Sequence, residues 1–321
     1  MKIFKVIFFT YIIVFTTNAA AIESDELLNN PSKDTNKLFS QIMPEIFYSY
    51  FDLNYNSRAG NNFSHFGGHA NKYGFAVNTL MLSTNTLAGI YLYKVDTKIN
   101  STSLLNPFPL TRTYQDTKNN SVLLHIARSY TNWLVVDLAG GYGNNRLNII
   151  SNILSETPNS QTGFAHVNNN NWFTSASVLF YKEINKFYIT GNVGTLYSRY
   201  NAPSYTLYYP TISTRIPQNI NTVLWIFENA NLYYPITDYV SPFISGGLLQ
   251  VAKYSDSNPF NVTLVNGSLP QLTLDKNAYR LACGVQFTHR SLGMRLGYEY
   301  YNAGSIFITK QLKAQLSFNF A

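Results

Sequence analysis

The last ten residues or so of the chain alternate between polar and apolar side chains without interruption. Between Gln311 and Phe320 every second side chain is apolar, and these are Leu312, Ala314, Leu316, Phe318 and Phe320. A period of two residues predicts a β-strand with one apolar and one polar face. Such an apolar face must be covered either by a protein core or by lipid, and the rest of the chain decides between the two.

The N-terminus has the pattern of a secretory signal. Lys2 and Lys5 form a positive start, residues 6–15 are a nearly unbroken apolar run, and small residues up to Ala21 supply a cleavage site. The apolar run is shorter than the about 20 residues that a membrane-spanning helix requires. We therefore expect the chain to be exported.

Three segments follow from this pattern. Residues 1–21 are predicted to be the signal peptide, and residues 22–43 a polar periplasmic leader or a plug of the barrel lumen. Residues 44–321 are predicted to form one outer-membrane domain, because no linker or internal repeat divides them.

Composition favours a membrane protein built from strands. Charged residues make up 12% of the chain and aromatic residues 16%, whereas soluble domains contain about a quarter charged residues. No apolar run after the signal is long enough for a spanning helix, and the single Cys283 cannot form an internal disulfide. The net charge of +7, which falls when Lys2 and Lys5 leave with the signal, is too diffuse for a nucleic-acid partner.

About twelve strands are predicted, each ten residues or longer. They lie near 44–55, 72–83, 87–99, 120–130, 133–147, 171–182, 187–200, 219–232, 239–254, 276–289, 292–301 and 306–320. A tilted membrane-spanning strand has about 9–11 residues, whereas the average strand of a soluble protein has about five or six. The strand lengths therefore favour lipid as the cover of the apolar faces.

The connections alternate between tight turns and long polar segments. The long segments are expected near 56–71, 100–119, 148–170, 201–218 and 255–275. Outer-membrane barrels have short periplasmic turns and long extracellular loops. The predicted fold is therefore all-β, a transmembrane antiparallel up-and-down β-barrel of about twelve strands in the outer membrane of a Gram-negative bacterium. Its expected partners are outer-membrane lipid or lipopolysaccharide and, during insertion, the barrel-assembly machinery.

The alternation also assigns side chains to faces. Because lipid offers no hydrogen bonds, charged side chains must point into the lumen. The predicted lumen-facing set is Lys94, Asp96, Lys98, His125, Asp137, Arg280, Arg295, Glu299 and Lys313. The last four come from three consecutive strands and form either an ion-pair cluster that stiffens the wall or a charged constriction. The phase of the strand that contains Glu228 stays open.

No catalytic or metal-binding set stands out. His65 and His69 have an i, i+4 spacing that would bind metal only on a helix, and Gly67 and Gly68 between them indicate a loop. His125 and Asp137 lie on neighbouring predicted strands, where a lumenal ion pair or hydrogen bond is the simplest interpretation. We expect no catalytic residue, no metal, no cofactor and no enzymatic activity.

The arrangement of Pro44 to Ala321 resembles the translocator β-domain of autotransporters. Twelve long strands, a preceding leader and a last strand ending in aromatic residues carry the resemblance, and the strand from Leu312 to Phe320 resembles the terminal signal that the barrel-assembly machinery recognises. The chain departs from this family in two respects. Only about twenty residues separate the expected signal from the expected barrel, so we expect no passenger domain, and Ala321 follows the terminal aromatic residue.

Three functions remain open at this point. The first is a passive channel or structural surface protein whose extracellular loops contact a ligand, with a small solute or a host-surface ligand as partner. The alternative is an adhesin or host-contact protein, which the long loops rich in Asn, Ser and Thr would serve. The third is an outer-membrane hydrolase, which would need a Ser–His or Asp–His set at the barrel rim.

Overall fold

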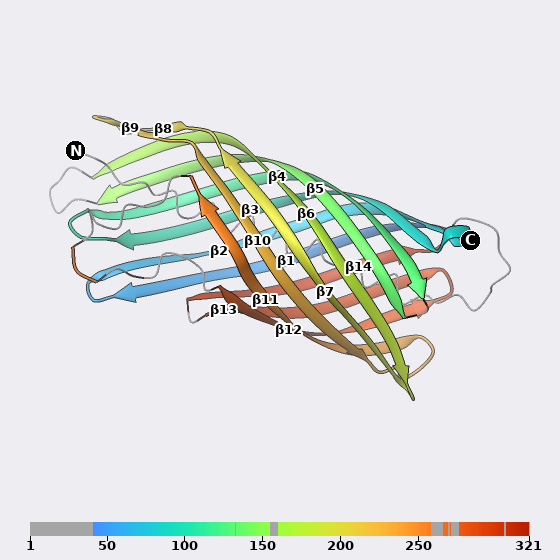
Figure 1. Ribbon diagram of the computed structural model, residues 1–321. Coiled ribbons are helices and arrows are strands. Elements are labelled where there is room, and N and C mark those ends of the chain that lie inside the picture. Colours follow the sequence, from blue (N-terminus) through green and yellow to red (C-terminus); the bar gives the residue numbers. More distant parts are fainter. Residues whose placement is uncertain are drawn as a thin grey trace.

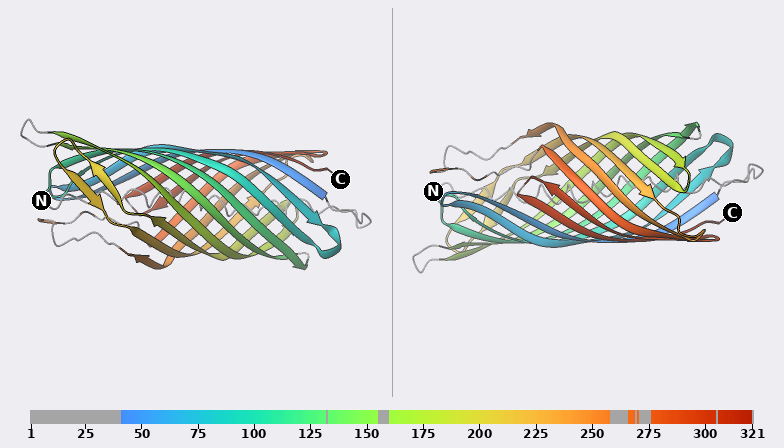
Figure 2. Two further views of the ribbon diagram at one scale, coloured as in Figure 1. Left: turned by 90° about the horizontal axis from the view of Figure 1, so that it is seen from above. Right: turned by 90° about the horizontal axis from the view of Figure 1, so that it is seen from below.

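The computed structural model describes residues 41–131, 133–154, 160–257, 266–268, 270, 276–304 and 306–320. Within these ranges the chain forms a closed antiparallel barrel of twelve long strands, with a short hairpin at one end (Figures 1 and 2). The expected signal peptide, most of the expected leader and Ala321 lie outside the described residues. Among those described, no helix is long and apolar enough to cross a membrane.

The strands follow one another around the barrel in sequence order. They are β1 (Gln41–Ala59), β2 (Asn62–Met81), β3 (Thr86–Leu104), β4 (Leu110–Thr131), β5 (Leu134–Leu154), β6 (Gln161–Ile184), β7 (Phe187–Ala202), β10 (Asn219–Tyr233), β11 (Val240–Asp256), β12 (Asn277–His289), β13 (Leu292–Ala303) and β14 (Phe307–Phe318). The hairpin consists of β8 (Tyr205–Tyr208) and β9 (Ser213–Ile216), and a short 3-10 helix, η3 (Leu82–Thr84), joins β2 to β3. The predicted all-β fold and its twelve barrel strands are confirmed.

The first and last strands close the barrel. β1 pairs with β14 over eleven residue pairs, from Glu45 with Ser317 to Tyr55 with Phe307, and a further bridge joins Ile42 to Phe320. Because of this pairing, neither β1 nor β14 presents a free edge to lipid, where an unpaired backbone group would cost several kcal/mol. The strand near the C-terminus is thus the closing strand of the barrel.

The strands extend further than the sequence indicated. Residues 56–71, expected as a long loop, are the ends of β1 and β2, joined by a tight turn at Gly60, whose φ of 59° is readily adopted by glycine. Large parts of 100–119 and 148–170 are also strand. The outward side chains of these ends are polar, for example Asn56 and Arg58 of β1, as expected where a strand extends beyond the lipid. The apolar alternation that predicts a strand is therefore lost there.

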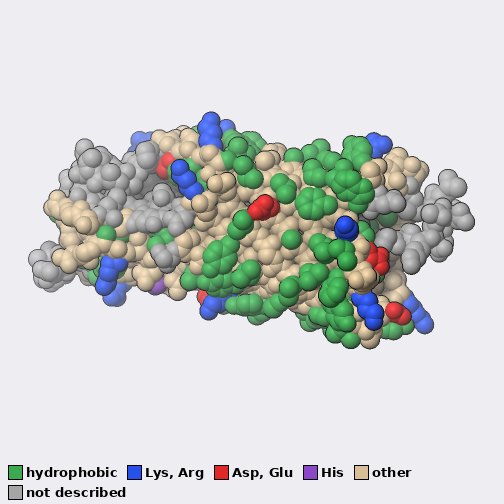
Figure 3. All heavy atoms as spheres, turned by 60° about the horizontal axis from the view of Figure 1, so that its bottom comes forward, with side chains coloured by type: hydrophobic (Ala, Val, Ile, Leu, Met, Phe, Trp, Pro, Cys, Tyr) green, Lys and Arg blue, Asp and Glu red, His purple; other side chains and the backbone are tan. Residues whose placement is uncertain are grey.

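An apolar belt surrounds the outer face. Large hydrophobic side chains point outward with a period of two residues, for example Leu281 and Leu312, each 56% exposed. Glu228 of β10 is exposed between Ile226 and Ala230 on the same outer face, which settles the phase that the sequence left open. Figure 3 shows a face on which acidic side chains interrupt the green belt.

The inward face carries an aromatic core in addition to polar residues. Tyr55 and Phe66 are fully buried and stack with ring centroids 4.7 Å apart. Phe307 of β14 packs against Phe66, and Trp225 and Phe227 of β10 belong to the same cluster. Side chains from different parts of the barrel wall thus contact each other inside the lumen. They make the lumen narrower than the number of strands alone would.

A charged substitution on the outward face of β13 tests whether that face contacts lipid. Leu296 lies in the belt at 41% exposure, whereas Arg295, its neighbour in sequence, points inward. Leu296→Arg is expected to reduce the free energy of unfolding by about 2–4 kcal/mol, because the guanidinium would enter hydrocarbon. Reversible urea unfolding in lipid vesicles measures this, and Leu296→Met, which keeps the side chain apolar, should stay within about 1 kcal/mol of the unmodified protein. Equal stability of the two variants would contradict the face assignment.

Candidate functional site in the barrel lumen

An ion cluster lies on the inward faces of three consecutive strands. Glu299 of β13 accepts contacts from Lys313 of β14, with Nζ 3.2 Å from Oε2, and from Arg280 of β12, with Nη1 3.7 Å from the same oxygen. All three side chains are largely buried, at 13–22% exposure. Two cations thus share one carboxylate, and the sequence prediction that these residues point into the lumen agrees with their position here.

Two further cations lie on aromatic rings beside this group. The guanidinium of Arg295 is 4.4 Å from the ring centroid of Phe243 and 6.0 Å from that of Tyr233. The ammonium of Lys72 is 4.8 Å from the ring of Tyr93. In cation–π contacts of this kind the ring quadrupole attracts the cation to the face of the ring. We call Lys72, Arg280, Arg295, Glu299 and Lys313 the lumenal cluster.

The sequence-based prediction missed Lys72. It is buried on β2 and lies one strand from Lys313, since Ser49 of β1 pairs with both residues. The signal was present in the sequence, because Lys72 shares its phase with Asn78 and alternates with the apolar Tyr73 and Phe75. The strand was expected to begin at residue 72, so its first positions were not assigned to a face.

The lumenal cluster borders two small cavities. One, of about 50 Å³, is lined by all five residues of the cluster. The other, of about 70 Å³, lies towards the periplasmic turns, where Arg290 and Thr288 line it. Arg295 and Gln315 line both cavities and therefore stand between them. Each cavity can hold water molecules or a small ion.

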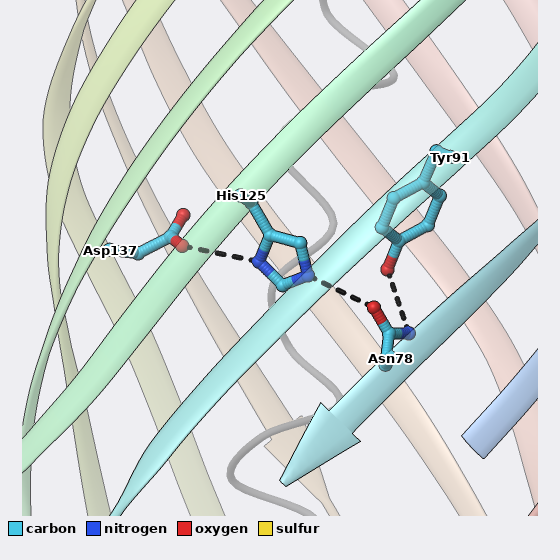
Figure 4. A network of polar contacts seen from close by, with 4 residues as sticks. All are labelled: Asn78, Tyr91, His125 and Asp137. Carbon is cyan, nitrogen blue, oxygen red and sulfur yellow. Dashed lines mark hydrogen bonds and ion pairs between the residues drawn. The ribbon is translucent and has the colours of Figure 1, made fainter. Parts of the chain in front are cut away.

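A second polar group joins four strands near the periplasmic end of the lumen (Figure 4). His125 Nδ1 lies 3.4 Å from Asp137 Oδ1, and His125 Nε2 lies 3.0 Å from Asn78 Oδ1. Asn78 in turn donates to the Tyr91 hydroxyl at 3.2 Å. Both ring nitrogens of His125 thus contact protein atoms. The group links the side chains of β2, β3, β4 and β5 on the inner face of the wall.

Three predicted lumen residues point the other way. Lys94 and Asp96 pair on the outer face at 3.2 Å, with side chains 35% and 31% exposed, and Lys98 is exposed on the same face. The inward side of β3 is occupied by residues such as Val95 and Ile99, which are buried. The prediction for Lys94, Asp96 and Lys98 is therefore wrong. The rule that charges face the lumen holds only within the lipid, and these residues lie beyond the belt, where water and headgroups can solvate an outward charge.

Buried asparagines form another inward feature that the sequence analysis did not identify. Asn119 of β4 donates to Asn145 of β5 at 2.6 Å, and Asn145 donates to Asn171 of β6 at 3.0 Å. Further along the sequence, Asn229 of β10 donates to Asn192 of β7 at 2.7 Å. Side-chain amides provide both donors and acceptors, so one asparagine can link two neighbours, although Asn229 Oδ1 is buried without a hydrogen-bond partner in the described part of the chain.

The histidines and the closing strand that the sequence analysis singled out can be placed on the structure. His65 and His69 lie on β2, a strand rather than the expected loop, with His65 exposed on the outer face. Among the residues that the structure describes, no group of three or more His, Cys, Asp or Glu side chains could hold a metal ion.

The apolar residues of the closing strand face outward, with Leu312 at 56%, Phe318 at 37% and Phe320 at 59% exposure. Their role as an assembly signal stays a prediction.

No family model matches the chain, and no curated protein matches it. Solved structures with the same fold do exist. The translocator domain of the autotransporter NalP from Neisseria meningitidis superposes with a TM-score of 0.67 at 13% identity, over 95% of this chain and 98% of that one. The β-domain of the Bordetella autotransporter BrkA gives 0.55 at 12% identity, over 86% and 99%. The Ralstonia pickettii toluene transporter TbuX gives 0.52 at 10% identity, over 91% and 92%.

These similarities extend over whole chains and concern the fold. Together with the closed barrel and its apolar belt, they identify an outer-membrane β-barrel that resembles autotransporter β-domains. The predicted fold class and location in the bacterial outer membrane are confirmed.

Gly89 of β3 leaves the space that the polar group around His125 (Asn78, Tyr91, His125 and Asp137) requires. A Cβ atom at this position would overlap Asn78 Oδ1 and the His125 ring. Gly89→Ala is therefore expected to displace both side chains and to reduce the free energy of unfolding by about 1–3 kcal/mol, the cost of unsatisfied buried polar atoms. Gly140→Ala is the control, because its Cβ would meet its nearest atom at 3.6 Å, an ordinary contact. Equal unfolding midpoints in urea for the two variants would contradict this account of the group.

Proposed function

We propose that the protein is a narrow passive channel in which the lumenal cluster forms a constriction that favours small anions. The observation that carries the proposal is the excess of positive charge in the cluster. Lys72, Arg280, Arg295 and Lys313 line a cavity of about 50 Å³ together with the carboxylate of Glu299, which contacts Arg280 and Lys313. The other carboxylate on the inward face of β1, that of Glu45, does not line this cavity. Rings of like charge in a pore select ions of the opposite sign.

The contacts of the cluster support this role. Arg280 Nε is buried and has no hydrogen-bond partner within the described part of the chain. Arg295 lies on the Phe243 ring, 4.4 Å from its centroid, and lines the same cavity. A passing anion could therefore receive hydrogen bonds from these groups. The similarity to the toluene transporter TbuX adds only that this barrel fold can serve transport.

Conductance in planar bilayers tests the channel directly. Purified protein, and a variant lacking residues 22–40, should show small discrete conductance steps and a reversal potential that indicates anion preference. Removal of 22–40 is included because this segment was predicted to be a leader or plug. Absence of conductance from both proteins would contradict the proposal.

Two lysines of β14 provide a matched pair of variants. Lys313 points into the lumen and contacts Glu299, whereas Lys310 is exposed on the outer face. Lys313→Gln should lower the ratio of anion to cation permeability by about twofold, the effect of one charge in a water-filled constriction. Lys310→Gln should leave the ratio unchanged, and Glu299→Gln should raise it. The same change from Lys310→Gln as from Lys313→Gln would show that the selectivity does not arise in the lumen.

The extracellular hairpin favours surface contact as a second candidate function. β8 and β9 lie at one end of the barrel, where β8 pairs with β6 (Figure 1), and their apolar side chains Leu207 and Ile216 pack on Leu147, Ile149 and Val167 of β5 and β6. Burial raises the pKa of the Tyr205 and Tyr209 hydroxyls. A hairpin anchored in this way can present a fixed surface to a host ligand.

Replacing residues 205–216 with a short Gly-Ser turn tests this second function. The variant should still insert, because the twelve barrel strands do not include the hairpin, and should lose binding to host cells. If the variant inserts and binds host cells unchanged, the hairpin is not the contact surface.

We also expect no hydrolysis of lipid or peptide. Hydrolytic activity that His125→Ala abolishes would contradict this expectation.

A further inference from the structure

We propose that the outer face of β3 to β6, immediately above the apolar belt, binds the phosphate groups of an outer-leaflet glycolipid through Lys118 and Arg146. The two residues lie directly opposite each other on β4 and β5. Both side chains are exposed. They point outward, because their sequence neighbours Asn119 and Asn145 are buried on the inward side.

Lys118 and Arg146 place two like charges opposite each other on adjacent strands. Like charges directly opposite each other on adjacent strands destabilise a sheet. Neither Lys118 nor Arg146 makes a hydrogen bond or an ion pair within the described ranges. On its other side Lys118 lies opposite Asp96 of β3, as Lys310 lies opposite Asp52, but the Asp96 carboxylate contacts Lys94 at 3.2 Å. A phosphate between Lys118 and Arg146 would replace repulsion by two charge-assisted contacts, for which ammonium and guanidinium groups are well suited.

The height of the pair fits the headgroup layer. Val122 and Tyr142 form the outward pair at the upper edge of the belt, and Tyr142 lies opposite Trp172 of β6. Tyr and Trp side chains mark the membrane interface. Lys118 and Arg146 lie four residues further along their strands, which is about 13 Å along a strand and about 10 Å along the axis of a tilted barrel. The long side chains of both residues can therefore reach the sugars and phosphates of the lipid.

The neighbouring side chains fit a phosphorylated sugar. Four exposed asparagines surround the pair on the outer face: Asn120, Asn144, Asn148 and Asn168. Their amides can donate to and accept from sugar hydroxyls. Two carboxylates lie on the same face: Asp96, opposite Lys118 and 3.2 Å from Lys94, and Asp116, opposite Lys98. Against them stand the cations Lys94, Lys98, Lys118 and Arg146, so positive charge is in excess on this face.

The test is binding of phosphorylated lipid A to the purified, folded barrel in neutral detergent. Retained lipid can be quantified by native mass spectrometry over a lipid titration. Lys118→Gln combined with Arg146→Gln should weaken binding about 10- to 30-fold, as expected when two cations near anionic headgroups are lost. The unmodified protein should bind dephosphorylated lipid A as weakly as this variant binds the phosphorylated form.

Arg112→Gln is the matched control. Arg112 is exposed on the same face of the same strand, six residues further from the membrane, and its replacement should leave the affinity within about twofold. Lys118→Arg combined with Arg146→Lys should also retain binding, because the charges persist. Faster gel mobility of the unboiled sample verifies that each variant is folded.

Three results would overturn the proposal. Equal binding of phosphorylated and dephosphorylated lipid A would exclude phosphate recognition. Equal binding by the double Gln variant and the unmodified protein would exclude this patch. Inorganic phosphate that displaces the lipid at comparable concentration would identify a free anion as the ligand instead. The unmodified protein also needs to lose affinity as salt increases, which tests the electrostatic contribution without any variant.

Discussion

The structure depends on the absence of hydrogen-bonding partners in lipid. Every backbone N–H and C=O group within the membrane must find its partner in the protein, and a sheet achieves this only when its first and last strands pair. Here that pair is β1 with β14. The same absence of polar partners divides each strand into an apolar outer face and a polar or aromatic inner face, so the position of the lumenal cluster is a consequence of barrel closure.

Closure also concentrates charge. The inward positions of β2, β12, β13 and β14 bring four cations and Glu299 around one cavity, although these residues are distributed over much of the sequence. Above the belt the constraint ends, and outward charges such as Lys118 and Arg146 become compatible with the fold. The proposed channel and the proposed lipid contact therefore use opposite faces of the same wall, at different heights.

The sequence predicted the fold more completely than the site. Alternation in β12 to β14 identified the faces of Arg280, Arg295, Glu299 and Lys313, because those strands lie mostly within the belt. Lys94, Asp96 and Lys98 were assigned to the wrong face because a period of two does not reveal where lipid ends. The asparagine ladders and the hairpin of β8 and β9 were not predicted, since uncharged polar residues look alike in strand ends and in loops.

A disulfide across the closing pair tests the central claim most directly. Ser49 and Lys313 lie opposite each other, where Cα atoms are about 4.5–5.5 Å apart, within the range of a disulfide. In a Cys283→Ser background, Ser49→Cys with Lys313→Cys should form a disulfide in the folded, membrane-inserted protein. Ser49→Cys with Gln315→Cys, displaced by two residues on the same face, should not. No cross-link in the first protein, or preferential cross-linking in the second, would contradict the closed barrel in this register.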